Sequence, residues 1–187
     1  MDQMEKHVNE ETIFECFAAA EKCETHSQTA ESFVDVEEYE NNTMYPAFAR
    51  WAKAVGYDEI ANLFLKVAGE EKLHAKWLRE LYKEMGTPTE GKDTLRAKEA
   101  LTLIQSNMGN LLQSNPKGLI EKALKVSYRV EMRECTQIYP AFRAQALESG
   151  NIKAAGIYQK VIDSETQHAQ WFEAALKDLL GQSNTMI

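Results

Sequence analysis

Eight residues of this chain are of types that bind metal ions, and they occur in a repeated pattern. Each half of the sequence carries a Glu-x-x-Glu pair and then a Glu-x-x-His pair, with 34 positions between the leading glutamates. The residues are Glu37, Glu40, Glu71 and His74 in the first half, and Glu131, Glu134, Glu165 and His168 in the second. A shift of 94 positions relates the two sets without a gap. The spacing predicts a metal site that uses both halves.

The repeat extends beyond these eight residues. Others in the same register are Tyr45, Pro46, Ala47, Phe48, Gly56 and Trp77, which recur as Tyr139, Pro140, Ala141, Phe142, Gly150 and Trp171. Such a self-match predicts one architecture used twice. Charged residues outside the pattern differ between the halves, and Glu70, for example, corresponds to Ser164. Retention of the eight residues beside such differences favours metal binding over a solvated helix face.

The spacing within each pair indicates which chemistry is expected. Residues three apart lie on one face of a helix, and the positions around Glu71 on that face, such as Val67 and Leu78, are apolar. A carboxylate on a buried face is costly unless it is paired or binds a metal. Carboxylates with imidazoles and no thiolate suit iron or manganese better than structural zinc or calcium.

Bundles with two iron or two manganese ions take one Glu from each of two helices and a Glu-x-x-His from each of the other two. Six of the eight residues meet that description, and Glu40 and Glu134 are additional. We therefore expect two metal ions held by four helices.

Helix-forming residues dominate the elements that must position these ligands, with four prolines and nine glycines in 187 residues. Asp58 and Asn115 are expected to cap the helices that follow them, and Gly56 and Gly150 to end the helices before them. Long helices are expected over about residues 27–55, 58–85, 116–149 and 152–180, and short ones over about 11–23 and 95–113.

Pro46 and Pro140 fall inside two of the expected long helices. Proline removes a backbone hydrogen bond, so the helices either end there or contain a kink or π-bulge. Apolar periodicity resumes after both prolines, which favours the kink or bulge. The predicted fold is all-α: one domain over 1–187, a four-helix bundle of two helix-pair repeats (about 1–93 and 94–187), with short additional helices.

Composition excludes several classes of partner. The net charge of −8 argues against nucleic acid or an anionic membrane surface. No stretch approaches the roughly 18 apolar residues of a membrane span, and the first residues lack a signal-peptide pattern. The three cysteines form no Cys-x-x-Cys pair and are expected to be reduced. A cytoplasmic or organelle-stroma location is expected.

The repeated pattern Glu-x-x-Glu-x-x-x-x-Tyr-Pro-x-Phe, then Gly, then Glu-x-x-His, is specific enough to indicate a family. From about residue 24 to 178 the chain resembles the rubrerythrin-like members of the ferritin-like superfamily, and most closely the symerythrins. Rubrerythrins carry the additional Glu only in the second half, whereas this chain has it in both. The resemblance implies a ferritin-like bundle with two Fe ions, while Mn or a mixed pair stays open.

The resemblance also implies roles for the ligands. It implies Glu37 and Glu131 as terminal ligands, Glu71 and Glu165 as bridges, and His74 and His168 as nitrogen ligands. Glu134 would exchange with His74 on redox change, and by internal symmetry Glu40 would do so opposite His168. Tyr45 and Tyr139 are expected either to hydrogen-bond to ligand carboxylates or to serve as core residues.

The function implied by the resemblance is that of a non-haem di-iron oxidoreductase acting on hydrogen peroxide or O₂, as a peroxidase or an oxidase. The chain has no cysteine-rich rubredoxin module, so electrons are expected from an external donor protein. The alternative is a non-enzymatic, ferritin-type iron-handling protein. Self-oxidation is expected near Phe17 or Val130 when no substrate or donor is present. The oligomeric state stays open.

Overall fold

A computed structural model describes residues 33–87 and 115–181, and within these ranges the chain is helical with no β-strand. Two of the helices contain a five-residue π-helical segment, labelled η. The elements of the first half are α2 (Phe33–Tyr39), η2 (Glu40–Met44), α3 (Tyr45–Ala54) and α4 (Asp58–Met85). Those of the second half are α7 (Pro116–Arg133), η3 (Glu134–Ile138), α8 (Tyr139–Glu148) and α9 (Ile152–Gly181).

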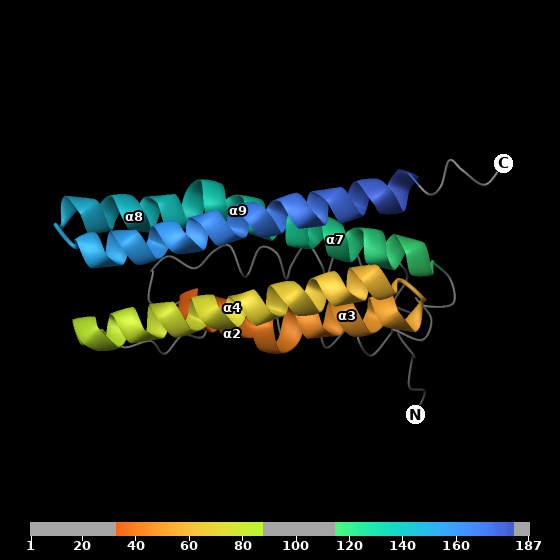
Figure 1. The fold of residues 1–187 in the computed structure, drawn as a ribbon, viewed down its shortest axis with the longest axis horizontal. Coiled ribbons are helices and arrows are strands. Elements are labelled where there is room, and N and C mark those ends of the chain that lie inside the picture. The colour runs from red at the N-terminus through yellow and green to blue at the C-terminus, as the bar shows by residue number, and fades with distance from the viewer. Residues whose placement is uncertain (1–32, 88–114, 182–187) are drawn as a thin grey trace, which may run out of the picture.

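Each half of the chain forms one layer of two long helices. In the first layer α2, η2 and α3 form one continuous rod that packs against α4, and in the second α7, η3 and α8 pack against α9 (Figure 1). The layers touch through α4 with α9 and through α3 with α7. This is the predicted four-helix bundle of ferritin-like type. The short helices predicted at about 11–23 and 95–113 lie outside the described residues.

The turns between paired helices follow the predicted signals, with one exception. Gly56 and Gly150 have φ of +84° and +73°, a left-handed conformation that glycine adopts without steric cost. The side chain of Asn115 accepts a hydrogen bond from the Gly118 N–H at 2.8 Å, which confirms the predicted cap. The predicted cap at Asp58 is wrong, because Asp58 is the first helical residue and Tyr57 precedes it. There the carboxylate still favours the helix through its dipole.

Both prolines follow a π-helical segment, which confirms the predicted bulge. The N–H of Tyr45 bonds to the carbonyl of Glu40 five residues earlier, and the N–H of Tyr139 bonds to that of Glu134. Pro46 and Pro140 then lie in the first turn of the next α-helical segment, where a missing N–H costs little. Each bulge therefore begins at the additional glutamate of its half.

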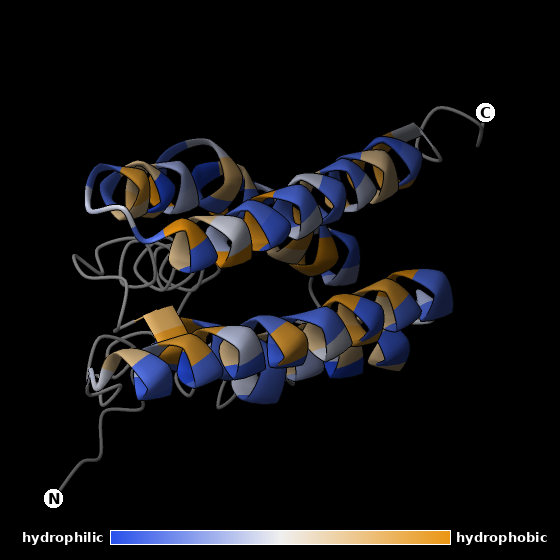
Figure 2. Ribbon diagram, turned by 60° about the vertical axis from the view of Figure 1, so that its left-hand side comes forward, coloured by the Kyte–Doolittle hydropathy of each residue, from blue (hydrophilic) through white to orange (hydrophobic). Residues whose placement is uncertain are grey.

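Two apolar clusters occupy the two ends of the bundle and leave its middle for polar residues. One cluster joins α3, α4, α7 and α9 around Tyr45, Phe64 and Phe172. The other joins α2, α4, α8 and α9 around Phe33 and Tyr139. The long helices α4 and α9 carry both apolar and polar residues, as amphipathic packing requires (Figure 2). Across the described ranges, no helix is both long and apolar enough to cross a membrane.

Candidate metal centre

All eight predicted ligand residues are buried in the middle of the bundle, each no more than 1% exposed. Every long helix contributes two of them. Glu37 lies on α2, Glu40 on η2, Glu71 and His74 on α4, Glu131 on α7, Glu134 on η3, and Glu165 and His168 on α9. Burial of so many ionisable groups is costly unless they neutralise one another or bind cations.

Six of the eight residues form two overlapping groups, within each of which one ligand atom per residue lies within 4.8 Å of the others. The first group is Glu37, Glu71, His74 and Glu165, and the second group is Glu71, Glu131, Glu165 and His168. Glu71 and Glu165 belong to both. Neither group comes from one half of the chain alone.

The two shared carboxylates each present one oxygen to each histidine. Nδ1 of His74 lies 2.7 Å from Oε2 of Glu71 and 2.8 Å from Oε1 of Glu165. Nδ1 of His168 lies 3.0 Å from Oε1 of Glu71 and 2.8 Å from Oε2 of Glu165. A carboxylate that offers its two oxygens to two neighbouring groups has the geometry required to bridge two cations.

The protonation of the cluster is set by burial and by the neighbouring charges. Burial alone lowers the pKa of His74, but the carboxylates of Glu165 and Glu71 outweigh it and hold that pKa well above its usual range. Burial raises the pKa of Glu37, Glu131 and Glu134 well above the usual range. Without cations, the cluster therefore retains protons that compensate its negative charge. Metal ions would displace them.

The additional glutamates lie beside the two groups. Burial is the main cause that raises the pKa of Tyr139, and the charges of Glu37 and Glu134 add to it. Glu134 therefore lies near Glu37, on the side of the first group. Burial likewise raises the pKa of Tyr45, with added contributions from Glu131 and Glu40, so Glu40 lies beside the second group. Each additional glutamate thus approaches the group whose histidine comes from the other half.

Glu134 also shows that the residues fit a cation. Both of its carboxylate oxygens are buried, and neither has a hydrogen-bond partner among the described residues. A buried acceptor without a donor costs free energy, which a bound cation would recover.

Tyr45 and Tyr139 hydrogen-bond to carboxylates of the predicted ligand set. The Tyr45 hydroxyl donates to Oε1 of Glu131, and the Tyr139 hydroxyl donates to Oε1 of Glu37. Burial raises the pKa of both tyrosines, so the hydroxyls keep their protons and act as donors. Both bonds connect one half of the chain to the other.

Sequence reasoning missed one polar contact of the centre. Because the other half has Ser164 at the corresponding position, the sequence indicated that Glu70 is an ordinary surface charge. In the structure, Oε2 of Glu70 lies 3.0 Å from Nε2 of His168. The contact crosses from α4 to α9. The sequence signal was weak, because Glu70 is distinguished only by preceding Glu71.

A pair of lysine–tryptophan contacts was also missed. Trp77 and Trp171 lie with their ring centroids 5.6 Å from those of His74 and His168. Nζ of Lys66 lies 3.3 Å from the ring centroid of Trp171, while the corresponding distance from Lys160 to Trp77 is 5.9 Å. The repeat could have indicated this pair, since the two lysines share the 94-residue offset.

Self-oxidation was predicted near two residues, of which the structure describes one. Val130 is fully buried and directly precedes Glu131 in α7. Phe17 lies outside the described residues.

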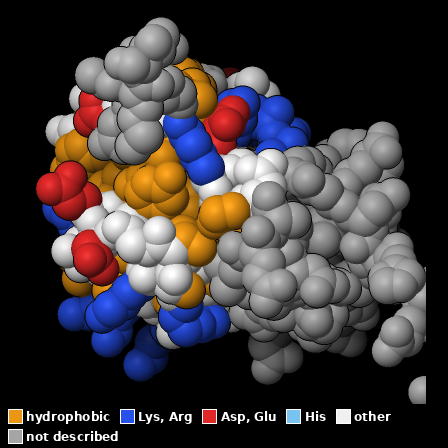
Figure 3. Space-filling view, turned by 90° about the vertical axis from the view of Figure 1, so that its right-hand side faces the viewer, with side chains coloured by type: hydrophobic (Ala, Val, Ile, Leu, Met, Phe, Trp, Pro, Cys, Tyr) orange, Lys and Arg blue, Asp and Glu red, His pale blue; other side chains and the backbone are white. Residues whose placement is uncertain are grey.

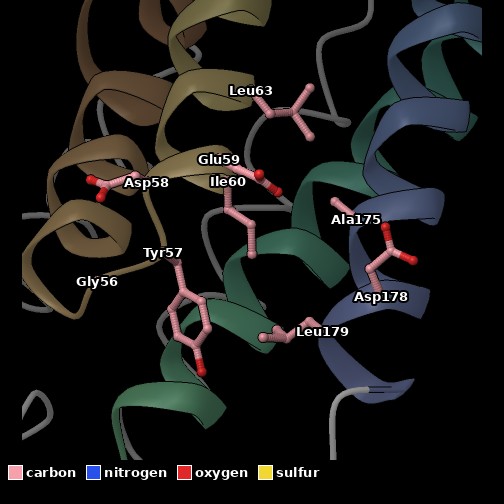
Figure 4. A pocket seen from close by; sticks show the side chains of 9 residues that line it. All are labelled: Gly56, Tyr57, Asp58, Glu59, Ile60, Leu63, Ala175, Asp178 and Leu179. Carbon is pink, nitrogen blue, oxygen red and sulfur yellow. The ribbon is translucent and has the colours of Figure 1, made fainter.

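A cleft of about 460 Å³ lies at one end of the bundle, where α4 begins and α9 ends. Tyr57, Ile60 and Leu63 face Ala175 and Leu179 across it (Figure 4). Apolar side chains gather on this end of the molecule among acidic and basic ones (Figure 3). None of the lining residues belongs to the eight, so the cleft is separate from the buried cluster.

The fold and the buried cluster define a class of protein: a four-helix bundle with a carboxylate- and histidine-lined centre suited to two metal ions. The Rubrerythrin family model matches residues 36–176, a span that contains all eight residues. The chain therefore belongs to the rubrerythrin family, whose members are di-iron redox proteins of the ferritin-like superfamily.

Individual relatives agree with this assignment. Symerythrin from Cyanophora paradoxa is 38% identical over 159 residues, which cover 83% of this chain and 87% of that protein. The crystal structure of that symerythrin, reduced with dithionite, matches with a TM-score of 0.74 and 33% identity, covering 86% of this chain and 93% of the other. Nigerythrin from Nitratidesulfovibrio vulgaris is 32% identical over 139 residues, 72% of this chain and 58% of that protein.

Proposed function

We propose that this protein is a non-haem di-iron oxidoreductase that reduces hydrogen peroxide or O₂ with electrons from an external donor protein. The observation that carries the proposal is the sharing of Glu71 and Glu165 between two four-residue groups. Iron is the proposed metal, with manganese or a mixed pair as the alternative, because the groups contain carboxylates and imidazoles and no thiolate. Relatives named rubrerythrin, nigerythrin and symerythrin support a redox role.

The proposed ligand set follows the two groups. Glu37, His74 and Glu134 would hold the first ion, Glu131, His168 and Glu40 would hold the second, and Glu71 and Glu165 would bridge them. When bound, the two ions supply reversible changes of oxidation state and a place for the oxidant. The six carboxylates would balance the charge of the ions, and burial of the cluster excludes bulk water.

The protein's own residues would hold and adjust the ligands during turnover. Tyr45 and Tyr139 fix one oxygen of Glu131 and of Glu37, which leaves the other oxygen of each directed toward its histidine at 3.3 Å. Glu134 and His74 are proposed to exchange as ligands of the first ion when its charge changes. The placement of Glu134 beside the first group supports this.

Metal analysis and turnover test the proposal. Protein purified from its own source should contain one iron ion for each group, two per chain, and should show a di-iron optical spectrum after air exposure. It should then oxidise an efficient reductant in a peroxide-dependent reaction. Iron uptake without such turnover, together with a cage-like assembly, would support ferritin-type iron handling instead.

Self-modification would separate an oxidase-type site from a peroxidase-type one. We propose that aerobic iron loading without a donor modifies the chain near Val130 or Phe17, since Val130 is buried and directly precedes Glu131 in α7. Intact mass and peptide mapping measure the change. An unmodified mass after repeated peroxide treatment would tell against an oxidase-type site and leave a peroxidase or an iron-storage function.

A further inference from the structure

His168 is held through both of its ring nitrogens. Nδ1 faces the carboxylates of the second group, and Nε2 lies 3.0 Å from Oε2 of Glu70. Ser164 Oγ lies 3.4 Å from the same nitrogen and donates to the same Glu70 oxygen at 3.4 Å. An imidazole that binds a cation through Nδ1 carries its proton on Nε2. In the metal-bound protein His168 therefore donates to Glu70.

His74 has no equivalent partner among the described residues. Its Nδ1 faces the first group in the same way, but within residues 33–87 and 115–181 no acceptor lies within hydrogen-bond distance of its Nε2. The repeat explains the difference, because the position that corresponds to Glu70 is Ser164. Ser164 does not supply that acceptor to His74, because its hydroxyl contacts Glu70 and the His168 of its own helix.

The position of Glu70 suits an outer partner rather than a ligand. Its side chain is 32% exposed, whereas the eight proposed ligands are no more than 1% exposed. It belongs to neither four-residue group. A carboxylate that accepts the outer N–H of a metal-binding histidine fixes the orientation of the ring and strengthens its binding through the other nitrogen.

We propose that Glu70 is a positioning residue that anchors His168 and makes the two metal positions inequivalent. Ligand exchange then occurs between His74 and Glu134 at the first ion, while His168 stays bound to the second. This inference rests on the proposed di-iron function. It adds that only one of the two histidines is free to leave its ion.

The direction of the exchange follows from which contacts must break. Movement of His168 away from its ion breaks the bond to Glu70, whereas movement of His74 breaks no bond at Nε2 within the described part of the chain. Glu134 is ready to replace His74, because both of its oxygens are buried without a hydrogen-bond partner among the described residues.

The test compares variants that remove or move the anchor. Glu70→Ser gives both halves a serine at this position, and the double variant Glu70→Ser/Ser164→Glu moves the carboxylate to the other half. Glu80→Ser is the matched control, because Glu80 is on the same helix, carries the same charge and is 62% exposed. Metal-free proteins are titrated with ⁵⁷Fe²⁺ without oxygen and then studied by Mössbauer spectroscopy.

The wild-type protein should show two distinct iron environments of equal area. Glu70→Ser should lower the affinity for one of the two ions by about 10- to 100-fold, the usual effect of losing an outer partner. The two iron environments of this variant should become alike. The double variant should restore two distinct environments, and crystals of its iron-loaded forms should show exchange at His168 with Glu40. Glu70→Gln, which keeps an acceptor oxygen, should retain much of the wild-type difference.

Two results would overturn the inference, and they are distinguishable. If Glu70→Ser binds both ions with wild-type affinities and an unchanged spectrum, Glu70 does not anchor His168. If neither the wild-type protein nor the Glu80→Ser control binds two iron ions, the di-iron function itself is wrong. Circular dichroism of the metal-free variants shows whether each is folded before iron is added.

Discussion

The two halves of the chain carry the same proposed ligands, but the residues around those ligands differ. His74 and His168 stack with their ring centroids 5.6 Å apart, and each faces the shared carboxylates through Nδ1. Behind them the halves diverge, since His168 contacts Glu70 and His74 has no such partner among the described residues. A repeated set of proposed ligands therefore need not make two equivalent metal positions. The residues that contact the ligands from outside can make them differ.

The tyrosines behind the ligands show the same divergence. Tyr45 is stacked between Phe64 and Phe172, with ring centroids 6.0 and 5.5 Å away. Tyr139 packs 6.3 Å from Tyr158, whose hydroxyl lies 3.0 Å from that of Tyr82. Tyr45 is thus stacked between two phenylalanine rings, while Tyr139 lies beside a tyrosine that belongs to a buried pair of hydroxyls.

The largest effect should come from the ligands that the halves share. Glu71→Ala and Glu165→Ala should each lower the affinity for both ions, because a bridging carboxylate binds both cations. The loss should exceed the roughly 100-fold that removal of an outer partner produces. Glu40→Ala and Glu134→Ala should cost less. Fe²⁺ titration of the four variants measures this, and a smaller loss for either bridging variant would contradict the assignment of bridges.

Metal affinity should rise with pH, by up to about tenfold per pH unit for each proton displaced. Burial raises the pKa of Glu37, Glu131 and Glu134. In the metal-free protein these carboxyl groups therefore keep their protons at pH values where an exposed glutamate has lost its proton. Those protons must leave before a cation binds, and raising the pH removes them. Calorimetric titration in buffers of different ionisation enthalpy counts the protons released.

A matched variant sharpens this prediction. Glu134→Gln removes one proton-binding group beside the first ion, so its pH dependence should be shallower than that of the wild-type protein. An equal slope would mean that Glu134 is not protonated in the metal-free cluster.

The two tyrosine hydrogen bonds should contribute equally in spite of their different surroundings. Tyr45→Phe and Tyr139→Phe each remove one bond to a ligand carboxylate, at a cost of about 1.5 kcal/mol in metal affinity, or roughly tenfold. Fe²⁺ titration gives the comparison. Unequal losses would show that the Tyr82–Tyr158 pair supports one ligand more than the other.

The smallest difference should come from the lysines. Lys66→Met should cost about 0.5–1 kcal/mol of stability, because Nζ of Lys66 lies 3.3 Å from the Trp171 ring centroid. Lys160→Met should cost less, since its distance to Trp77 is 5.9 Å. Chemical denaturation followed by tryptophan fluorescence measures both. Equal losses would remove this difference between the halves.

Much of the fold and the convergence of the eight residues could be predicted because the repeat carries both. A proline at a fixed distance from each glutamate pair, with apolar periodicity resuming after it, was enough to predict a kink or a π-bulge in each of these helices. The contact between Glu70 and His168 could not be predicted, because it depends on where α4 lies against α9, and that register is set by packing along whole helices. A residue without a counterpart in the other half looks like an ordinary surface difference between the repeats. Only the structure shows which residue it contacts on the neighbouring helix.

The hydrogen bonds from Tyr45 to Glu131 and from Tyr139 to Glu37 have a consequence for ancestry. Each half supplies the donor that the other half needs, so a half-length ancestor would have completed this centre only as a pair of identical chains. Identical chains cannot differ at one position, and such an ancestor would have carried either two glutamates or two serines where Glu70 and Ser164 now stand. A single chain that contains both copies can change one position while it keeps the other.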